Sequence, residues 1–165
     1  GRAATAGRLG HRRAGEIGPG SHLMDIGCVW GPLAIFAAKR FRCRVTAVDA
    51  DADVFPYLAL HAAINKVEVE TLRCRFERLT KQRLNGVDVI TGADICFWEN
   101  MIEAVSRLID TALEAEMRGI VIADPERPPF CTLAEQCLER HGGELIEWEL
   151  KESRGRGVVL VINND

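Results

Sequence analysis

The stretch His22-Leu-Met-Asp-Ile-Gly-Cys-Val-Trp-Gly31 decides the fold of this chain. Its apolar start predicts a strand over 23–26, and Gly27 and Gly31 predict a tight turn. A helix over 32–41 follows and begins with proline, which is tolerated there because the first amide of a helix has no partner anyway. A strand, a glycine turn and a helix in this order aim unpaired helix amides over the strand end. The stretch is therefore typical of a nucleotide-binding loop.

The same alternation of strand and helix patterns continues along the chain. Apolar and β-branched runs predict strands over 23–26, 44–49, 67–72, 87–90, 120–123, 145–150 and 158–162. Helical spacing of apolar residues predicts helices over 32–41, from about Phe55 to Asn65, over 101–117 and over 132–141. Asn65 is expected to take the left-handed conformation that ends a helix, and Gly119 is expected to close the helix over 101–117. Between the last two strands, Arg154-Gly-Arg-Gly157 is a hairpin signal.

These elements predict the fold class and the domain organisation. Strand-helix units followed by an antiparallel pair describe a doubly wound α/β fold, here a seven-stranded, mostly parallel sheet with a C-terminal antiparallel hairpin. A length of 165 residues suits one domain, so 1–165 is expected to form it with 1–16 as a lead-in segment. The chain begins at Gly1 without a methionine, which leaves room for a missing upstream piece.

Charge limits the partners that we expect. Lys and Arg number 21 and Asp and Glu number 24, which gives a net charge of -3 at pH 7. Such a chain has no general attraction to nucleic acid, so no nucleic-acid partner is expected. One local basic stretch is interpreted as a solvated face; it consists of Arg73, Arg75, Arg78, Lys81 and Arg83. The oligomeric state stays open.

The cysteines and the apolar runs indicate the compartment. Six cysteines are scattered without a Cys-x-x-Cys pair: Cys28, Cys43, Cys74, Cys96, Cys131 and Cys137. They are interpreted as reduced, structural thiols of an intracellular protein. The longest apolar runs are far below the roughly 18 residues that cross a bilayer, so a cytoplasmic protein without a membrane partner is expected. No grouping of His and Cys predicts a metal site.

Ligands of doubly wound sheets bind beyond the carboxyl ends of the strands, where the strand order reverses. The residues in these positions are Asp25, Gly27 and Gly31 after strand one, Asp49 after strand two, Phe76 and Glu77 after strand three, Asp94 to Trp98 after strand four, and Asp124 to Phe130 after strand five. Asp49 follows the glycine turn by about 20 residues and is placed to accept hydrogen bonds from a ribose diol. A dinucleotide fingerprint would need glycines where Val29 and Pro32 stand, so a nicotinamide cofactor is a poor match.

Asp25-Ile-Gly-Cys-Val-Trp-Gly31, together with Asp49 and the seven-strand pattern, resembles class I S-adenosylmethionine-dependent methyltransferases over roughly residues 17–162. Within that superfamily, Gly92-Ala-Asp-Ile-Cys-Phe97 is similar to the Asp-x-x-Tyr or Phe signature after strand four of seven-strand protein lysine methyltransferases. Asp124-Pro-Glu-Arg-Pro-Pro-Phe130 is similar to the Asp-Pro-Gly-Arg-Pro segment of the electron transfer flavoprotein β-subunit lysine methyltransferases. That group is akin to bacterial ribosomal-protein methyltransferases.

The resemblance implies S-adenosyl-L-methionine as the cofactor and methyl transfer to an amine nitrogen, with a lysine of a protein partner as the expected acceptor. The implied cofactor-binding residues are Asp25, Gly27, Cys28, Gly31, Asp49, Phe76, Glu77 and Asp94. Asp25 would lie near the amino group of the methionine moiety or order the glycine loop, Asp49 would hold the ribose, and Phe76-Glu77 would lie near the adenine. The implied catalytic residues are Asp94, which would orient the amine or assist its proton loss, and Phe97, which together with Trp98 would desolvate it.

Three positions depart from the family pattern. Val29 replaces a glycine, and a positive φ there would be costly for a β-branched residue. Phe97 lacks a tyrosine hydroxyl, and Glu126 stands where the related group has glycine. An alternative therefore stays open, a non-catalytic methyltransferase-like protein-interaction module whose cofactor loop is degenerate at Val29. A nicotinamide-dependent oxidoreductase is a third interpretation.

Several of these residues also have a purely structural interpretation. Asp25 and Asp49 suit caps at strand ends, and Asp94 suits a cap of the turn before Trp98. The segment 124–127 suits a turn with a surface ion pair, and a tryptophan such as Trp98 is more often a packing residue. The Asn-Pro-Pro-Tyr pattern of amino-directed nucleic-acid methylases is missing after strand four, which disfavours methylation of a base.

Overall fold

The computed structural model describes residues 17–150 and 155–164. The expected lead-in segment 1–16 and Arg154 of the hairpin signal lie outside the described residues. The strands are β1 (His22–Ile26), β2 (Arg44–Asp49), β3 (Glu70–Arg73), β4 (Val89–Ala93), β5 (Gly119–Asp124), β6 (Glu144–Leu150) and β7 (Gly155–Asn163). The helices are α1 (Pro32–Phe41), α2 (Phe55–Asn65), α3 (Lys81–Leu84), α4 (Glu99–Glu114) and α5 (Pro128–His141), with 3-10 turns η1 (Ala52–Val54) and η2 (Phe76–Arg78).

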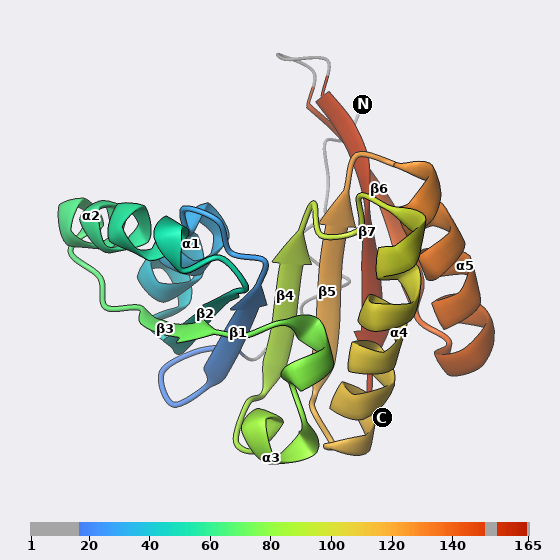
Figure 1. Ribbon diagram of the computed structural model, residues 1–165, viewed down its shortest axis with the longest axis horizontal. Coiled ribbons are helices and arrows are strands. Elements are labelled where there is room, and N and C mark those ends of the chain that lie inside the picture. Colours follow the sequence, from blue (N-terminus) through green and yellow to red (C-terminus); the bar gives the residue numbers. More distant parts are fainter. Residues whose placement is uncertain (1–16, 151–154, 165) are drawn as a thin grey trace, which may run out of the picture.

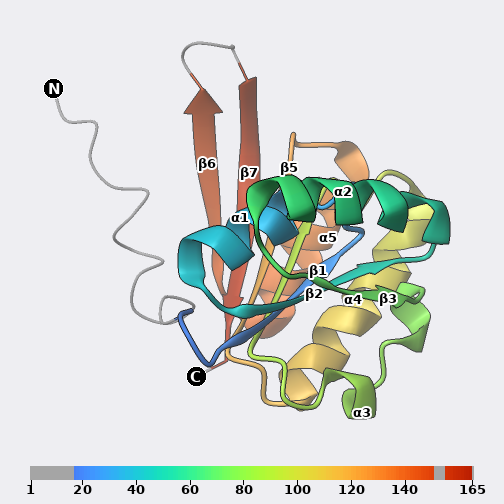
Figure 2. The same cartoon turned by 90° about the vertical axis from the view of Figure 1, so that its left-hand side faces the viewer.

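One seven-stranded sheet runs through the molecule with the order β3-β2-β1-β4-β5-β7-β6 (Figure 1). β1 to β5 are parallel, whereas β7 pairs antiparallel with both β5 and β6. The β6 and β7 ribbon extends beyond the other strands (Figure 2). The predicted doubly wound, mostly parallel sheet with an antiparallel hairpin is confirmed. Because the strand order reverses between β1 and β4, a ligand is expected beyond the carboxyl ends of these two strands.

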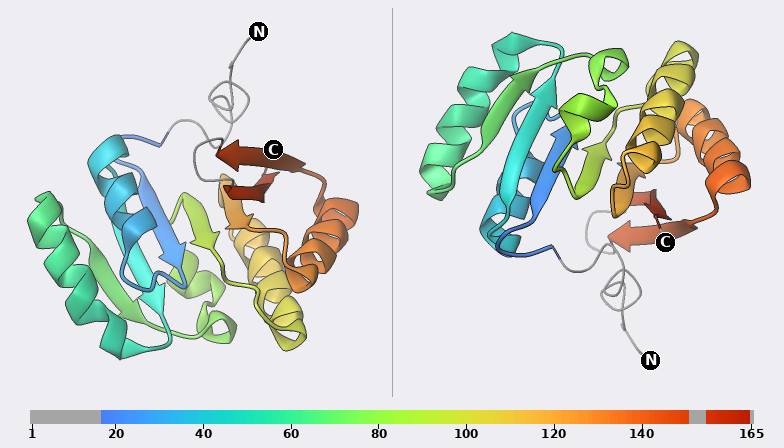
Figure 3. Two further views of the ribbon diagram at one scale, coloured as in Figure 1. Left: turned by 90° about the horizontal axis from the view of Figure 1, so that it is seen from above. Right: turned by 90° about the horizontal axis from the view of Figure 1, so that it is seen from below.

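Helices cover both faces of the sheet, with α1 and α2 on one side and α4 and α5 on the other (Figure 3). Successive side chains of a strand point to opposite faces, so β1 contributes to two apolar cores. Leu23 packs in the core with Ala34 and Leu58, under α1 and α2. Met24 packs in the second core with Val105, beneath α4. No helix in the described ranges is long and apolar enough to span a membrane.

Around α2 and β3 the element ends differ from the prediction. Lys66, and not Asn65, takes the left-handed conformation after α2, with φ 56°. The Asn65 side chain instead donates a hydrogen bond to the carbonyl of His61 at 2.9 Å. β3 begins at Glu70, three residues later than expected, and it is an edge strand. An exposed edge gives an alternating pattern little to pack against, so pairing with β2 sets its length.

The ends of α4 and α5 also shift. α4 ends at Glu114, whereas Met117 lies in the following turn with 1% of its surface exposed. The apolar period therefore continued past the helix because the core also covers the turn. Gly119 is the first residue of β5 and does not close the helix. α5 begins at Pro128, four residues earlier than predicted, because prolines fit the first turn of a helix.

Candidate functional site

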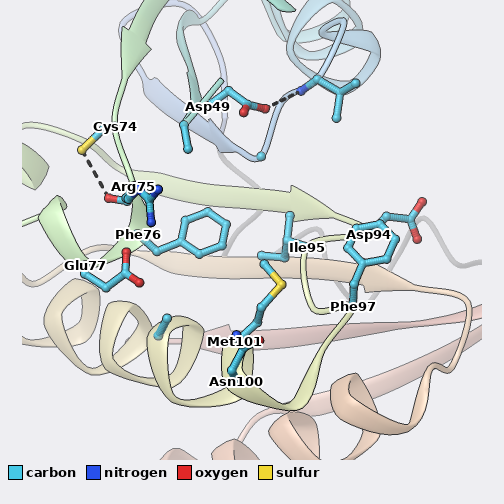
Figure 4. A pocket seen from close by; sticks show the side chains of 14 residues that line it. Asp49, Cys74, Arg75, Phe76, Glu77, Asp94, Ile95, Phe97, Asn100 and Met101 are labelled. Atoms are coloured by element: carbon cyan, nitrogen blue, oxygen red, sulfur yellow. Dashed lines mark hydrogen bonds between the residues drawn. The ribbon is translucent and has the colours of Figure 1, made fainter. Parts of the chain in front are cut away.

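A pocket of about 410 Å3 opens beyond the carboxyl ends of β1 to β4 (Figure 4). This volume lies within the roughly 300–1,000 Å3 of small-molecule sites. The pocket is lined by Gly27, Val29, Asp49, Ala50, Cys74, Arg75, Phe76, Glu77, Asp94, Ile95, Phe97, Asn100, Met101 and Ala104. The structure thus brings together six of the predicted site residues: Gly27, Asp49, Phe76, Glu77, Asp94 and Phe97. Asp25, Cys28 and Gly31 do not line it.

The two glycines of the loop after β1 are required for different reasons. Gly27 has φ 63°, and a Cβ there would lie 2.7 Å from Cγ2 of Ile95, so a side chain would intrude into the floor of the pocket. Gly31 has φ 78° and precedes α1, and a Cβ there would lie 2.7 Å from Cγ of Leu58 in α2. Gly27 therefore keeps the pocket open, whereas Gly31 lets α1 and α2 pack together.

Val29 lies between these glycines in the left-handed conformation, with φ 48°. A β-branched residue therefore has the positive φ that the glycine of the family pattern would adopt freely, and it is strained. Its amide donates a hydrogen bond to Oδ2 of Asp49 at 3.1 Å, which ties the loop to the end of β2. The side chain is 50% exposed and forms part of the pocket wall. Glu126, which also stands where the related group has glycine, likewise has a positive φ of 68°.

Asp49 lies at the mouth of the pocket with spare acceptor capacity. Its Oδ2 accepts from the amide of Val29, and its Oδ1 accepts from the amide of Asp51 at 3.0 Å. A carboxylate offers about four acceptor positions, so two remain for a ligand. Two neighbouring hydroxyls of a ribose match this number, so the residue present fits the expected cofactor.

The middle of the pocket is apolar. Phe76 from η2, Ile95 from the loop after β4 and Met101 from α4 converge there (Figure 4). Ile95 is 3% exposed, and Phe76 and Met101 pack against the core beneath it. Glu77 adds a carboxylate at the edge. A flat apolar wall next to a carboxylate suits an adenine ring joined to a ribose.

Asp25 lies beneath the loop and outside the pocket. Its side chain is 2% exposed and accepts hydrogen bonds from the hydroxyl of Thr91, at 3.2 Å, and from the amide of Ala34. Burial raises the pKa of the Asp25 carboxyl to about 7. Because Ala34 lies in the first turn of α1, Asp25 joins the end of β1 to the start of that helix. Of its two expected roles, this position favours ordering of the loop.

Cys28 is also withdrawn from the pocket. It is 4% exposed, and its amide donates a hydrogen bond to the carbonyl of Val48 at 3.1 Å. Burial raises the pKa of the Cys28 thiol to about 12, so the side chain is an uncharged packing group at neutral pH. Cys28 supports the loop through its backbone.

Asp94 and Phe97 lie at the end of the pocket opposite Cys74 and Arg75 (Figure 4). Asp94 is half-exposed, and its Oδ1 accepts a hydrogen bond from Arg127 at 2.7 Å. The guanidinium carbon of Arg127 lies 4.4 Å from the centre of the Phe97 ring, a cation–π contact. The second carboxylate oxygen of Asp94 has no protein partner among the described residues. One oxygen of Asp94 is thus fixed and the other is available.

Arg127 is held in turn by Asp124, at the end of β5. Its amide donates to Oδ1 of Asp124 at 2.7 Å, and its guanidinium donates to Oδ2 at 3.0 Å. Asp124 is 2% exposed, and burial raises the pKa of its carboxyl although the hydrogen bonds from Arg127 oppose the change. The segment 124–127 therefore forms the predicted turn with its ion pair, and Arg127 also fixes Asp94 through a second ion pair.

Sequence reasoning missed several residues at the pocket. The sequence suggests Arg127 as a surface partner of Asp124, but it gives no sign of the link to Asp94 because the two are 33 residues apart. Asn100 and Ala104 line the pocket from the start of α4. Their signal was available, since a helix that follows strand four begins at the same edge of the sheet. Trp98, for which the sequence suggests either a place beside the amine or a packing role, is 70% exposed and does not line the pocket.

No group of three or more His, Cys, Asp or Glu side chains suited to a metal ion occurs in the ranges that the structure describes.

The fold and the pocket define a class of protein that binds an adenosine-containing cofactor beyond the ends of β1 and β2. Residues 23–115, more than half of the chain, match the model of the family described as methyltransferase domain. The chain belongs to the methyltransferase domain family. This membership confirms the expected class of enzyme and its cofactor, S-adenosylmethionine, and the nicotinamide interpretation is not retained. The finer resemblance to electron transfer flavoprotein β-subunit lysine methyltransferases stays a prediction.

Solved structures with the same fold include several methyltransferases. The methyltransferase domain of a bacterial Hen1 protein is 16% identical, with a TM-score of 0.67 over 87% of this chain and 90% of that one. An rRNA methylase from Streptococcus thermophilus is 10% identical, with a TM-score of 0.70 over 100% of both chains. TrmK from M. capricolum, in complex with S-adenosylhomocysteine, is 12% identical, with a TM-score of 0.67 over 94% of this chain and 67% of that one. No curated protein matches the chain in sequence. At these identities the likeness concerns the fold alone.

Proposed function

We propose that this methyltransferase transfers a methyl group from S-adenosylmethionine to an amine nitrogen, namely the side chain of a lysine in a protein. The observation that carries the proposal is the environment of the two carboxylate oxygens of Asp94. One of its oxygens is fixed by Arg127 at 2.7 Å, the other is available, and the Phe97 ring lies against the same guanidinium. A carboxylate oxygen next to an aromatic surface is suited to receive an N–H group of an amine.

In this proposal the described pocket residues hold the cofactor. Asp49 accepts hydrogen bonds from the ribose hydroxyls, Phe76 and Ile95 contact the adenine, and the loop at Gly27 contacts the methionine moiety. The pocket runs from Arg75 to Asp94, so the reactive end of the cofactor would lie at Asp94 and Phe97. The complex of TrmK with S-adenosylhomocysteine supports this type of ligand for the fold.

The chemistry asks for an uncharged and well-aligned acceptor. When bound, S-adenosylmethionine supplies a methyl group on a positively charged sulfur. A neutral amine attacks the methyl carbon in line, and the sulfur leaves as an uncharged thioether. A lysine side chain has an ordinary pKa of about 10.4 and is charged near pH 7. The half-exposed Phe97 ring would remove water from the amine and favour its neutral form, while the available oxygen of Asp94 accepts an N–H and aims the lone pair.

A labelled-donor assay tests the proposal. A cell extract is given S-adenosylmethionine with a labelled methyl group, and the products are separated into protein and RNA. We expect label on lysine in the protein fraction. RNA is included because one structural neighbour is an rRNA methylase. Label confined to RNA would refute the lysine acceptor and leave the methyltransferase assignment intact.

The substitution Asp94→Asn tests the role of the Asp94 carboxylate in methyl transfer. It should lower turnover about 100-fold, the size of effect typical of a positioned acid-base group, with cofactor affinity kept. Asp53→Asn is the matched control, because this exposed carboxylate does not line the pocket. Equal turnover in the two variants would remove the role of Asp94.

A second candidate is supported by one observation, the strained Val29 in the cofactor loop. We infer that a chain unable to bind S-adenosylmethionine would act as a non-catalytic protein-interaction module. Calorimetric titration with the cofactor and with S-adenosylhomocysteine separates the two candidates, since only the enzyme is expected to bind them.

A further inference from the structure

A second hollow, of about 290 Å3, lies beside the cofactor pocket at the ends of β2 and β3. It is lined by Ala50, Arg73, Cys74, Arg75, Arg78 and Arg83. Ala50, Cys74 and Arg75 also line the cofactor pocket. Cys74 and Arg75 lie at the end opposite Asp94 and Phe97 (Figure 4). The four arginines belong to the basic stretch noted in the sequence. We call the space that they line the arginine hollow.

The charges of the arginine hollow are not neutralised by the protein. Within the described residues, none of its four guanidinium groups forms an ion pair with a carboxylate. Lys81, the remaining member of the basic stretch, pairs with Glu114 at 2.8 Å and is not part of the hollow. The nearby carboxylates of Asp49 and Asp51 accept hydrogen bonds from backbone amides instead.

Two of the arginines are fixed by the wall of the hollow. Nε of Arg73 donates to the carbonyl of Ala50 at 3.3 Å, and a terminal nitrogen of Arg83 donates to Sγ of Cys74 at 3.4 Å. Each of these contacts uses one N–H group of a guanidinium that has five, so most donors stay available. Four like charges held around one small hollow repel each other unless an anion lies between them.

We propose that the arginine hollow binds backbone phosphates of a single nucleic-acid strand. The guanidinium fork matches the oxygens of a phosphate, which can meet several donors at once, whereas a carboxylate has two oxygens and one charge. Four positive charges exceed what one phosphate neutralises, so consecutive phosphates of a strand fit better than a free ion. S-adenosylmethionine carries no phosphate, so the cofactor leaves this site free. The net charge of -3 is a sum over the whole chain, so it does not reveal a local group of arginines.

The proposal predicts a contact to the strand that carries no sequence information. It is independent of the lysine acceptor, because binding is measured without methyl transfer. The probe is a fluorescent oligouridine of about twelve nucleotides, within the roughly 4–16 nucleotides that single-strand sites span. With four phosphate contacts, the logarithm of the binding constant should fall with the logarithm of salt concentration with a slope of about -3.

The test compares Arg78→Gln and Arg83→Gln with Arg40→Gln. Each hollow variant should bind the oligonucleotide about tenfold more weakly, and its salt slope should be smaller by about 0.7. Arg78 is exposed and has no side-chain partner among the described residues, so its loss should not affect folding. Arg40→Gln is the control, because it removes one charge from the exposed surface of α1 and Arg40 does not line the hollow. Cofactor affinity reports that each variant is folded.

Three results would overturn the proposal. The first is equal oligonucleotide affinity in wild type, Arg78→Gln and Arg83→Gln. The second is binding of a polyglutamate peptide as tight as that of the oligonucleotide, which would assign the hollow to an acidic protein. The third is binding of inorganic phosphate as tight as that of the oligonucleotide, which would assign the hollow to a small phosphorylated ligand. Loss of oligonucleotide binding in both hollow variants, with Arg40→Gln unchanged, is the result expected.

Discussion

Replacing Val29 by glycine measures the strain in the cofactor loop. Val29 has φ 48°, and a non-glycine residue held in this region costs about 1–3 kcal/mol. Glycine removes this cost but loses about 0.5–1 kcal/mol more chain entropy on folding. The difference between these ranges is about 0–2.5 kcal/mol, so we expect Val29→Gly to stabilise the protein by about 1 kcal/mol. For a domain of this size each kcal/mol raises the Tm by about 2–4 °C.

Urea unfolding followed by circular dichroism gives this free energy, and two further variants interpret it. Val29→Ala keeps the Cβ and removes only the branch, so it should fall between wild type and Val29→Gly. Lys66→Gly is the matched control, because Lys66 has φ 56° after α2 and lies outside the pocket. Glycine at 29 keeps the amide that donates to Asp49, so the loop should stay attached to β2.

The strain argument is refuted if Lys66→Gly stabilises the protein and Val29→Gly does not. Cofactor titration of the same variants decides the second question at this position. Equal affinity in wild type and Val29→Gly would mean that the pocket tolerates the valine. Affinity that is absent in wild type and gained in Val29→Gly would favour the non-catalytic module.

Three further perturbations test the loop and the strand ends. Asp49→Asn should weaken cofactor binding about tenfold or more, because a neutral amide replaces charge-assisted acceptors, and an unchanged Kd in calorimetry would contradict its ribose role. Gly27→Ala places a Cβ 2.7 Å from Ile95 at φ 63°, so urea unfolding should show a loss of about 1–3 kcal/mol, and wild-type stability would contradict the close approach. Asp25 has a pKa raised to about 7 by burial, so the folded state retains a proton that the unfolded chain releases above its ordinary pKa of 3.8. As the pH rises from about 4 to about 7, the free energy of unfolding of wild type should therefore fall relative to that of Asp25→Asn, by up to about 1.4 kcal/mol per pH unit. Parallel pH profiles of the two proteins would show that Asp25 is not responsible.

The strands and their order of appearance were predictable because the pattern of each strand depends only on its own residues and the turn residues beside it. A buried parallel strand such as 120–123 is an unbroken apolar run between turn residues, and its pattern does not depend on distant contacts. Element ends were less predictable. Met117 continues an apolar period beyond α4, since the core covers a turn as readily as a helix.

At the pocket, the residues that directly follow a strand were predictable because parallel strands end at one edge of the sheet. Asp49, Phe76 and Asp94 were found in this way. Asp25 and Cys28 belong to the stretch 22–31 that forms β1 and the glycine loop, but their side chains are buried and do not line the pocket. Whether a residue of a tight loop faces the ligand or the core depends on backbone dihedral angles that its identity alone does not fix.

The sequence by itself determined the fold class, the glycine loop and the acid at the end of β2, because hydrophobic period, glycine and strand-end position act over a few residues. Only the tertiary structure decided which charges meet. It joined Arg127 to Asp94 across 33 residues, and it left four arginines of one basic stretch without carboxylate partners among the described residues while Lys81 paired with Glu114. The physical reason is that electrostatic partners are set by distance in space, and the sheet brings strand ends together that the chain keeps far apart.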